Sequence, residues 1–332
     1  MRILLWHVHG SWTTAFVQGR HDYVVPVLPD RSADGVGRAR TWNWPASVRE
    51  CTPAQLRCED FDVVVLQRPH ELALVREWLG RKPGVDLPAI YLEHNAPDES
   101  PCMQRHVLAD RRDIPIAHVT YFNELYWDNG SAPTTVIEHG VVDPGSRYTG
   151  ELRAGAVVVN EPGRRGRIVG ADLVPRFAEV GPVDLFGMAA TPFVTALGHP
   201  GIVPHDDLET QEQMHTEVAR RRVYLHPMRW TSLGLSLIEA MHLGMPVVAL
   251  AATEVVEAVP AAAGVISTDP ARLVAAYRNY LDDPEAAAAA GRHGRQAALE
   301  RYGLARFLRD WDALLESVSA RAGVASLSGA RR

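Results

Sequence analysis

One carboxylate, Glu239, stands in the middle of an apolar segment expected to form a helix from Thr231 or Ser232 to Leu243, with Gly244 as its stop. A carboxylate buried there without hydrogen-bond donors would be strongly destabilising. Donors must come from the protein or from a ligand, and a ribose offers two adjacent hydroxyls. A structural role, in which Glu239 pairs with an arginine or caps a neighbouring element, explains the burial equally well. Apolar side chains cover most of the helix, at Leu233, Leu235, Leu237, Ile238, Met241 and Leu243.

The start of the same helix offers a site of a second kind. The backbone N–H groups of Ser232, Leu233, Gly234 and Leu235 would have no partners within the helix, and they would lie at the positive end of its dipole. Gly234 has no side chain to keep a ligand from the backbone. A helix start of this kind suits an anion. A diphosphate there and a ribose at Glu239 would together be a nucleotide diphosphate lying along the helix.

Three arginines among glycines follow a predicted strand in the second half of the chain. Arg164, Arg165 and Arg167 lie in the stretch from Asn160 to Arg167. Guanidinium groups bind phosphate oxygens bidentately and would offset the charge of a departing nucleotide. The stretch therefore predicts a diphosphate clamp, with the choice among the three arginines left open and a solvated basic loop as the alternative.

Polar residues also end two predicted strands of the first half. His94 ends one of them, and the segment from His7 to Ser11 ends the other. Ligands of open α/β sheets bind at the carboxyl ends of the strands, although a histidine there is often bonded to a backbone carbonyl. His7 and His9 could form a metal pair, but no third ligand clusters with them, so no metal is expected. No GxGxxG follows the first strand of either half, which argues against a dinucleotide oxidoreductase.

Short β-branched or apolar runs alternate with helix-like segments over nearly the whole chain. Several runs are continuously apolar, as in parallel strands that are covered on both faces. The sequence therefore predicts an α/β protein of βαβ units in doubly wound sheets. Strands are expected at residues 2–9, 23–28, 61–66, 89–94, 116–120, 135–139, 156–160, 183–186, 223–226, 246–250 and 264–267.

A stretch rich in turn-forming residues, 143–150, separates the two series of strands. We predict an N-terminal Rossmann-like domain at 1–148 and a C-terminal one at 149–319, each of ordinary domain size. A last helix is expected at about 304–318, where it can pack back on the first domain. Residues 320–332 are small, polar and basic, which predicts a flexible tail.

The bulk properties exclude several classes of function. The chain has 332 residues and a net charge of −6, so no overall basic field favours nucleic acid. Three scattered cysteines are typical of reduced thiols in a cytoplasm. No stretch approaches the roughly 20 apolar residues of a membrane span. A cytoplasmic protein without a transmembrane segment is expected, with peripheral membrane association left open.

The stretch from Tyr224 to Leu250 resembles the signature of retaining GT-B glycosyltransferases of family 4, the glycosyl transferases group 1. That signature usually reads Pro-Ser-x-x-Glu-x-Phe-Gly-Leu-x-x-x-Glu-Ala-Met-Ala-x-Gly-x-Pro-Val-Val. The resemblance implies two Rossmann-like domains with the active site in the cleft between them. It also implies that Glu239 holds the donor ribose. The first glutamate of the family signature contacts the transferred sugar, and this chain has Thr231 at that position. The matching positions are Pro227, Gly234, Leu235, Glu239, Ala240, Met241, Gly244, Pro246, Val247 and Val248.

The same resemblance implies roles for weaker candidates. In the family, an arginine and a lysine bind the donor phosphates. At the corresponding place this chain has its arginine stretch, which contains no lysine. Its histidine that faces the donor sugar corresponds to His94, and its glycine-rich loop between donor and acceptor corresponds to Gly10 and Ser11. The segment 201–204, with Val203, resembles the one whose backbone meets the base.

Taken together, the resemblance implies a retaining transfer of a sugar from a UDP-, GDP- or similar donor to a hydroxyl acceptor. No divalent metal is needed if the arginines and the helix dipole carry the charge, so a metal-independent reaction is expected. No cofactor beyond the nucleotide sugar is expected. The acceptor is left open among cell-envelope polysaccharides, glycolipids and secondary metabolites. Thr231 also motivates a different class, a non-catalytic relative that binds nucleotide or sugar as a partner subunit. A nucleotide-sugar epimerase or a phosphorylase would keep the fold and change the reaction.

Overall fold

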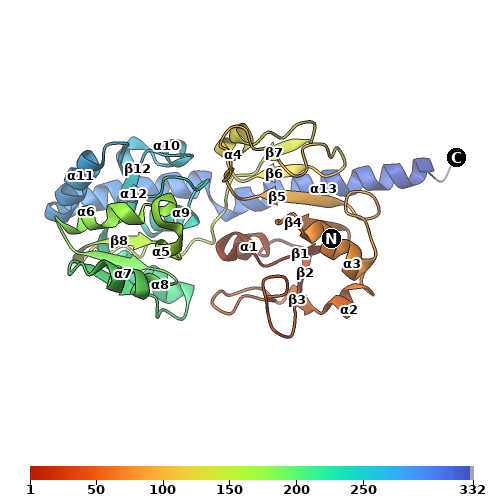
Figure 1. Cartoon of the computed structure of the whole chain (residues 1–332), viewed down its shortest axis with the longest axis horizontal. Coiled ribbons are helices and arrows are strands. Elements are labelled where there is room, and N and C mark those ends of the chain that lie inside the picture. Colours follow the sequence, from red (N-terminus) through yellow and green to blue (C-terminus); the bar gives the residue numbers. More distant parts are fainter. Residues whose placement is uncertain (330–332) are drawn as a thin grey trace. The chain divides into compact units, whose positions relative to one another are not determined.

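The computed structural model describes residues 1–329, with side chains up to Arg321, and residues 330–332 of the predicted tail lie outside this range. The chain folds into two compact units (Figure 1). Unit 1 comprises Met1–Val142 together with the chain from Leu304 onward, and unit 2 comprises Asp143–Gly303. Each unit is built around its own parallel sheet. The fold is therefore the doubly wound α/β architecture that the sequence predicts.

Unit 1 holds a seven-stranded sheet in the order β3-β2-β1-β4-β5-β6-β7, in which all neighbours run parallel. Its central strands are continuously apolar because helices cover both faces. The strands are β1 (Arg2–Leu5), β2 (Asp22–Pro26), β3 (Val48–Cys51), β4 (Val63–Leu66), β5 (Ala89–Glu93), β6 (Ile116–His118) and β7 (Thr134–Val136). The helices are α1 (Gly10–Phe16), α2 (Pro53–Leu56), α3 (Glu71–Leu79), α4 (Tyr121–Tyr126) and α13 (Leu304–Gly329).

An aromatic cluster attaches the C-terminal helix α13 to α1. The ring of Trp311 lies 5.4 Å from that of Trp12 and 5.0 Å from that of Phe16, in edge-on arrangements that favour tight packing. The helix continues to Gly329 rather than ending near 318, so residues 320–329 are helical and do not form the predicted tail. Small helix-forming residues without a proline allow this extension. No helix in the described part of the chain is both long and apolar enough to cross a membrane.

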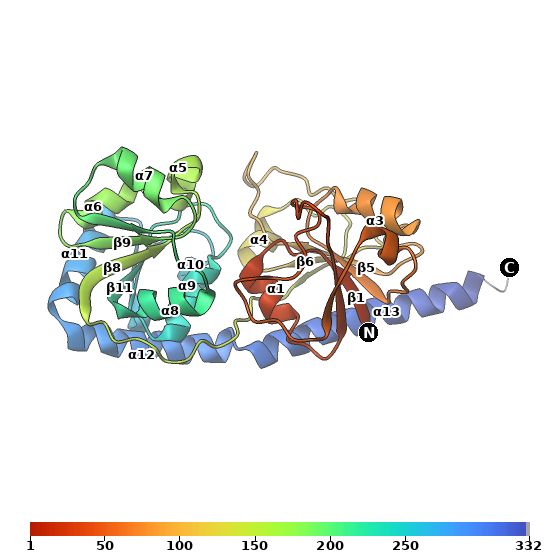
Figure 2. The ribbon, with the colours of Figure 1, turned by 90° about the horizontal axis from the view of Figure 1, so that it is seen from below.

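Unit 2 holds a six-stranded parallel sheet in the order β10-β9-β8-β11-β12-β13. Helices α5, α6 and α7 cover one face, and α8, α9 and α12 cover the other (Figure 2). The strands are β8 (Leu152–Val158), β9 (Val183–Phe186), β10 (Ile202–His205), β11 (Arg221–His226), β12 (Val247–Leu250) and β13 (Gly264–Ser267). The α-helices are α5 (Pro162–Arg165), α6 (Val174–Ala178), α7 (Ala190–Leu197), α8 (Gln211–Arg220), α9 (Leu235–Leu243), α10 (Val255–Ala258), α11 (Pro270–Asp282) and α12 (Pro284–Arg301). Short 3-10 turns occur at η1 (Gly166–Val169), η2 (Ala171–Leu173) and η3 (Ala261–Ala263).

Two strands, β3 and β10, were not predicted from the sequence, and both are edge strands. An edge strand has a partner on one side only, so its residues need not be continuously apolar. β3 carries an arginine and a glutamate, and β10 carries a proline. A proline is tolerated in a strand mainly at such an edge.

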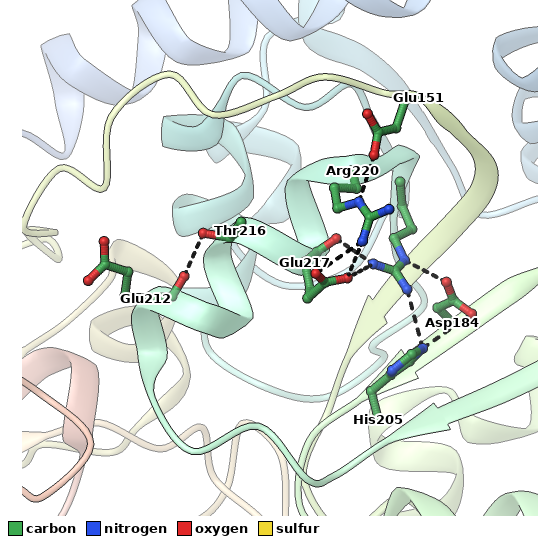
Figure 3. A network of polar contacts seen from close by, with 8 residues as sticks. Glu151, Asp184, His205, Glu212, Thr216, Glu217 and Arg220 are labelled. Carbon is green, nitrogen blue, oxygen red and sulfur yellow. Dashed lines mark hydrogen bonds and ion pairs between the residues drawn. The ribbon is translucent and has the colours of Figure 1, made fainter.

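A polar network fixes α8 against the sheet of unit 2 (Figure 3). Arg221, at the start of β11, pairs with Asp184 of β9 at 2.5 Å and with Glu217 of α8 at 2.8 Å. Arg220 adds a contact of 2.7 Å to Glu151, just before β8. The Arg221–Asp184 pair is nearly buried, so each charge depends on the other. This network sets the position of α8, which faces the helix of Glu239.

Candidate functional site

The chain between β11 and α9 forms an irregular loop, residues 227–234. The helix begins at Leu235 with Gly234 as its N-cap, and no side chain caps it. The prediction that Thr231 or Ser232 caps this helix is therefore wrong. Both residues lie in the loop before the helix, and the first turn keeps the uncapped backbone start that suits an anion.

Backbone contacts hold this loop against the arginine stretch and explain why it is not helical. The N–H groups of Arg229 and Trp230 donate to the carbonyl oxygen of Ile168 at 2.8 and 3.2 Å. Gly170, at φ +71°, approaches so closely that a Cβ on it would lie 2.0 Å from the carbonyl oxygen of Pro227. The structure thus brings the arginine stretch and the loop before α9 together within unit 2.

Glu239 is buried, with 5% of its surface exposed, as its apolar surroundings predict. Its Oε2 accepts a hydrogen bond from Gln211 Nε2 at 3.1 Å and lies 3.4 Å from His215 Nε2. The two α8 side chains also contact each other at 3.0 Å. Of the two sources of donors left open by the sequence, the protein therefore supplies partners to one carboxylate oxygen, through α8. Sequence reasoning missed both partners, since nothing in the sequence pairs α8 with α9.

The structure distinguishes the three candidate arginines by their partners. Arg164 forms a bidentate pair with Glu161, and Arg167 pairs with Asp172 at 2.9 Å. Arg165 is half-buried, and within the described residues its side chain forms no hydrogen bond or ion pair. Burial, and then the positive charge of Arg164, lowers the pKa of Arg165. A bound anion would relieve both effects, so Arg165 is the arginine best suited to a phosphate.

The remaining predicted residues of unit 2 lie in different environments. Ser232 and Leu233 are buried at 5% exposure each, and Thr231 is half-buried with its hydroxyl 3.7 Å from the sulfur of Met228. Val203 is 44% exposed on the edge strand β10, and β9 and β8 lie between it and β11.

A residue that sequence reasoning did not select, His226, lies under the start of α9. It ends β11, it is 1% exposed, and neither ring nitrogen has a hydrogen-bond partner within the described residues. A Cβ on Gly234 would lie 2.7 Å from the Cε1 atom of His226, so only glycine fits there without movement. Burial lowers the pKa of His226 to about 4. The signal available in the sequence was its place at the carboxyl end of a strand.

In unit 1, the predicted candidates lie at the carboxyl edge of the sheet. Gly10 and Ser11 begin α1, and His94 directly follows β5. A Cβ on Gly10 would lie 3.1 Å from Trp42 Nε1, so this loop passes close under an indole ring. His9 stacks on His94, with ring centroids 3.7 Å apart and planes at 10°.

The described residues contain no group of three or more His, Cys, Asp or Glu side chains that could hold a metal ion. His7, considered above as one of a metal pair with His9, has other contacts. Its Nδ1 lies 3.1 Å from the carbonyl oxygen of Gly37, and its ring packs on Trp44.

Comparisons with known proteins place these features in context. Residues 207–297, which include α8 and α9, match the family model of glycosyl transferases group 1. No curated protein sequence matches the chain. Sucrose-phosphate synthase from Thermosynechococcus elongatus superposes with a TM-score of 0.75 at 14% identity, over 97% of this chain and 100% of that one. Anabaena HepE in complex with UDP and glucose gives 0.69 at 14% identity, over 96% and 100%.

A third similar structure is a mutant of S. aureus TarM in complex with fondaparinux, α-GlcNAc-glycerol and UDP. It superposes with a TM-score of 0.63 at 12% identity and covers 76% of this chain, which spans 55% of TarM. At these low sequence identities, the similarities show a shared fold only. With two parallel α/β units of seven and six strands, this chain has the two-domain, Rossmann-like GT-B fold of glycosyltransferases.

Proposed function

We propose that the chain is a retaining glycosyltransferase that moves a sugar from a UDP- or GDP-type donor to an acceptor hydroxyl without a metal. The main support is that three features lie close together within unit 2. They are the buried Glu239, the uncapped start of α9, and the segment that contains Arg165, whose side chain is unpaired. The family match over 207–297 supports it. So do the UDP complexes of HepE and TarM.

In this proposal Glu239 accepts hydrogen bonds from the donor ribose. A carboxylate has two oxygens and can accept about four hydrogen bonds in all, so it can bind two adjacent hydroxyls. Gln211 and His215 hold one oxygen from the side of α8, which fixes the orientation of the carboxylate. Because the side chain is already ordered before the ligand arrives, ligand binding does not lose the free energy needed to order it.

The diphosphate lies against the start of α9 and the guanidinium of Arg165. The bond between the sugar's anomeric carbon and the phosphate oxygen breaks, and its electron pair stays on the diphosphate. Positive charge and backbone N–H groups stabilise the negative charge that develops there. The acceptor oxygen bonds to the same face of the sugar, and its proton passes to the departing phosphate oxygen. His94 and Thr231 contact the transferred sugar.

The direct test is to incubate the full-length chain with UDP- and GDP-sugars labelled in the sugar. Transfer, or slow donor hydrolysis, with the anomeric configuration kept supports the proposal. A donor that is bound and never consumed would instead identify a non-catalytic binding subunit, and a changed sugar still attached to nucleotide would identify an epimerase. Thermal stabilisation by a panel of nucleoside diphosphates selects the base, because a ligand of the folded state raises apparent stability by mass action.

Replacing Arg165 with glutamine is expected to weaken UDP binding about 10-fold to 100-fold, since one charge-assisted contact to phosphate contributes about 1.5–3 kcal/mol. Uridine binding should change little, because the nucleoside lacks the phosphates. Calorimetric titration of both ligands measures the difference. Arg176→Gln, an exposed arginine on α6, is the matched control. Equal UDP affinity in the Arg165 variant and the control would remove Arg165 from the site.

Removal of divalent metal is expected to leave UDP affinity and turnover unchanged within about twofold, because Arg165 and the helix start supply the positive charge that a metal would otherwise provide. The measurement is turnover after dialysis against EDTA, with and without added Mg²⁺ or Mn²⁺. Loss of turnover that Mn²⁺ restores would contradict the metal-independent mechanism while leaving the donor site in place.

A further inference from the structure

Three histidines from distant parts of the sequence meet at the carboxyl edge of the unit 1 sheet. His9 follows β1, His94 follows β5 and His139 follows β7. The rings of His9 and His94 stack in parallel at 3.7 Å, and His139 packs on His94 with ring centroids 5.0 Å apart and planes at 52°. We call these three residues the histidine cluster.

Within the described residues, the ring nitrogens of the cluster have no hydrogen-bond partner. His139 is 0% exposed, and both of its nitrogens are buried without a partner, as is Nδ1 of His94. His9 and His94 are only half-buried, so the cluster opens to solvent on their side. Buried imidazole nitrogens are costly when unpaired. A bound group could contact the cluster from the side of His9 and His94.

The two charged side chains that act most directly on the imidazoles of the cluster are both arginines. His9 faces Arg68, from the loop after β4, and His139 faces Arg306, from α13. Both arginines also pair with acids: Arg68 with Glu71 and Asp34, and Arg306 with Asp310. In the described structure, no carboxylate contacts the cluster itself. The acid next to His94 in the sequence, Glu93, pairs with His106.

This environment keeps the imidazoles neutral in the absence of a ligand. Burial first, and then Arg68, lowers the pKa of His9 to about 4. Burial first, and then His9 and Arg306, lowers the pKa of His139 to about 3. For His94, burial and then the two neighbouring histidines lower the pKa well below its ordinary value. A negative ligand would reverse these effects and draw in a proton.

We propose that the histidine cluster binds an oxyanion, a carboxylate or phosphate group carried by the transferred sugar or by the acceptor. The identity of that carrier rests on the proposed function, whereas anion binding itself does not. The cluster has no carboxylate or amide among its contacts, and each imidazolium that forms offers two N–H donors to an anion. Its stacked rings do not converge on a point, and the described residues contain no group suited to a metal.

Sulfate is the probe, because it stays a dianion over the pH range of the test. We expect calorimetric titration of the full-length chain, in an Arg165→Gln background that weakens the unit 2 site, to show binding at least about 10-fold tighter at pH 5.5 than at pH 7.5. Proton uptake should accompany binding, and heats measured in buffers of different ionisation enthalpy report it. Sulfate binding that does not depend on pH, or no binding at all, would overturn the proposal.

Variants assign the effect to the cluster. His9→Phe and His139→Phe keep a flat ring and remove the nitrogens, and each is expected to remove most of the pH dependence. His9 is half-buried, so its variant keeps the test open if the His139 variant does not fold. The matched control is His293→Phe, an exposed histidine on α12. An unchanged pH dependence in the folded His9 variant would also contradict the proposal.

Two donors identify the carrier. If UDP-glucuronate binds at least about 10-fold more tightly than UDP-glucose at pH 5.5, and His9→Phe removes the difference, the anion belongs to the transferred sugar. If the two donors bind equally while sulfate still binds to the cluster, the acceptor carries the anion. Failure of the sulfate test with intact UDP binding would overturn only this inference. Failure of UDP binding with an intact sulfate response would overturn only the proposed function.

Discussion

Glu239→Gln is expected to weaken UDP binding about 100-fold and to abolish measurable sugar transfer. Glutamine keeps the volume of the side chain but removes the negative charge that would accept two ribose hydroxyls, and hydrogen bonds to a charged group contribute about 1.5–3 kcal/mol each. It also places an amide opposite the amide of Gln211, which now donates to the carboxylate at 3.1 Å. Calorimetric titration of UDP gives the affinity, and a labelled-donor assay gives the turnover.

Glu209→Gln provides the matched control for the loss of one negative charge, because Glu209 is exposed in the loop before α8. UDP affinity in this control should stay within about twofold of the unmodified protein. Thermal unfolding of the Glu239 variant without ligand shows whether it is folded. A folded Glu239→Gln protein that binds UDP as well as the control does would exclude Glu239 from the nucleotide site.

Acidification is expected to destabilise the protein through its buried neutral histidines, and His226 in unit 2 is the clearest case. Burial lowers the pKa of His226 to about 4, below its value of 6.5 when exposed. The unfolded chain therefore binds more protons between these values, so stability is complete above pH 6.5 and falls as the pH decreases toward 4. This one residue should reduce the free energy of unfolding of unit 2 by about 2 kcal/mol between pH 7.5 and pH 5.

His226→Phe should remove that part of the pH dependence, because phenylalanine keeps a ring against Tyr224 and Gly234 and cannot bind a proton. Urea unfolding followed by pulsed hydrogen exchange and mass spectrometry reads peptides of unit 2 separately from those of unit 1. This separation is needed because a two-unit chain need not unfold in one step. His293→Phe should behave like the unmodified protein, and the same pH dependence in the His226 variant would refute this assignment.

Much of the fold could be predicted from local patterns. Every predicted strand corresponds to a strand of the structure, because continuous apolar runs in a βαβ chain have few alternatives to buried parallel strands. The edge strands β3 and β10 were missed because a strand that is paired on one side needs no such run. The start of α9 was misplaced because contacts from Ile168, distant in the sequence, hold the preceding loop out of the helix.

The sequence by itself determined the two αβ series, the burial of Glu239 within an apolar helix and the end of that helix at Gly244, which adopts φ +89°. These features follow from periodicity and from the conformational freedom of glycine, which are properties of neighbouring residues. Only the tertiary structure decided which side chains meet Glu239, which arginine stays unpaired and that three histidines gather on one sheet edge. Such contacts join residues far apart in the chain, and packing rather than local preference selects them.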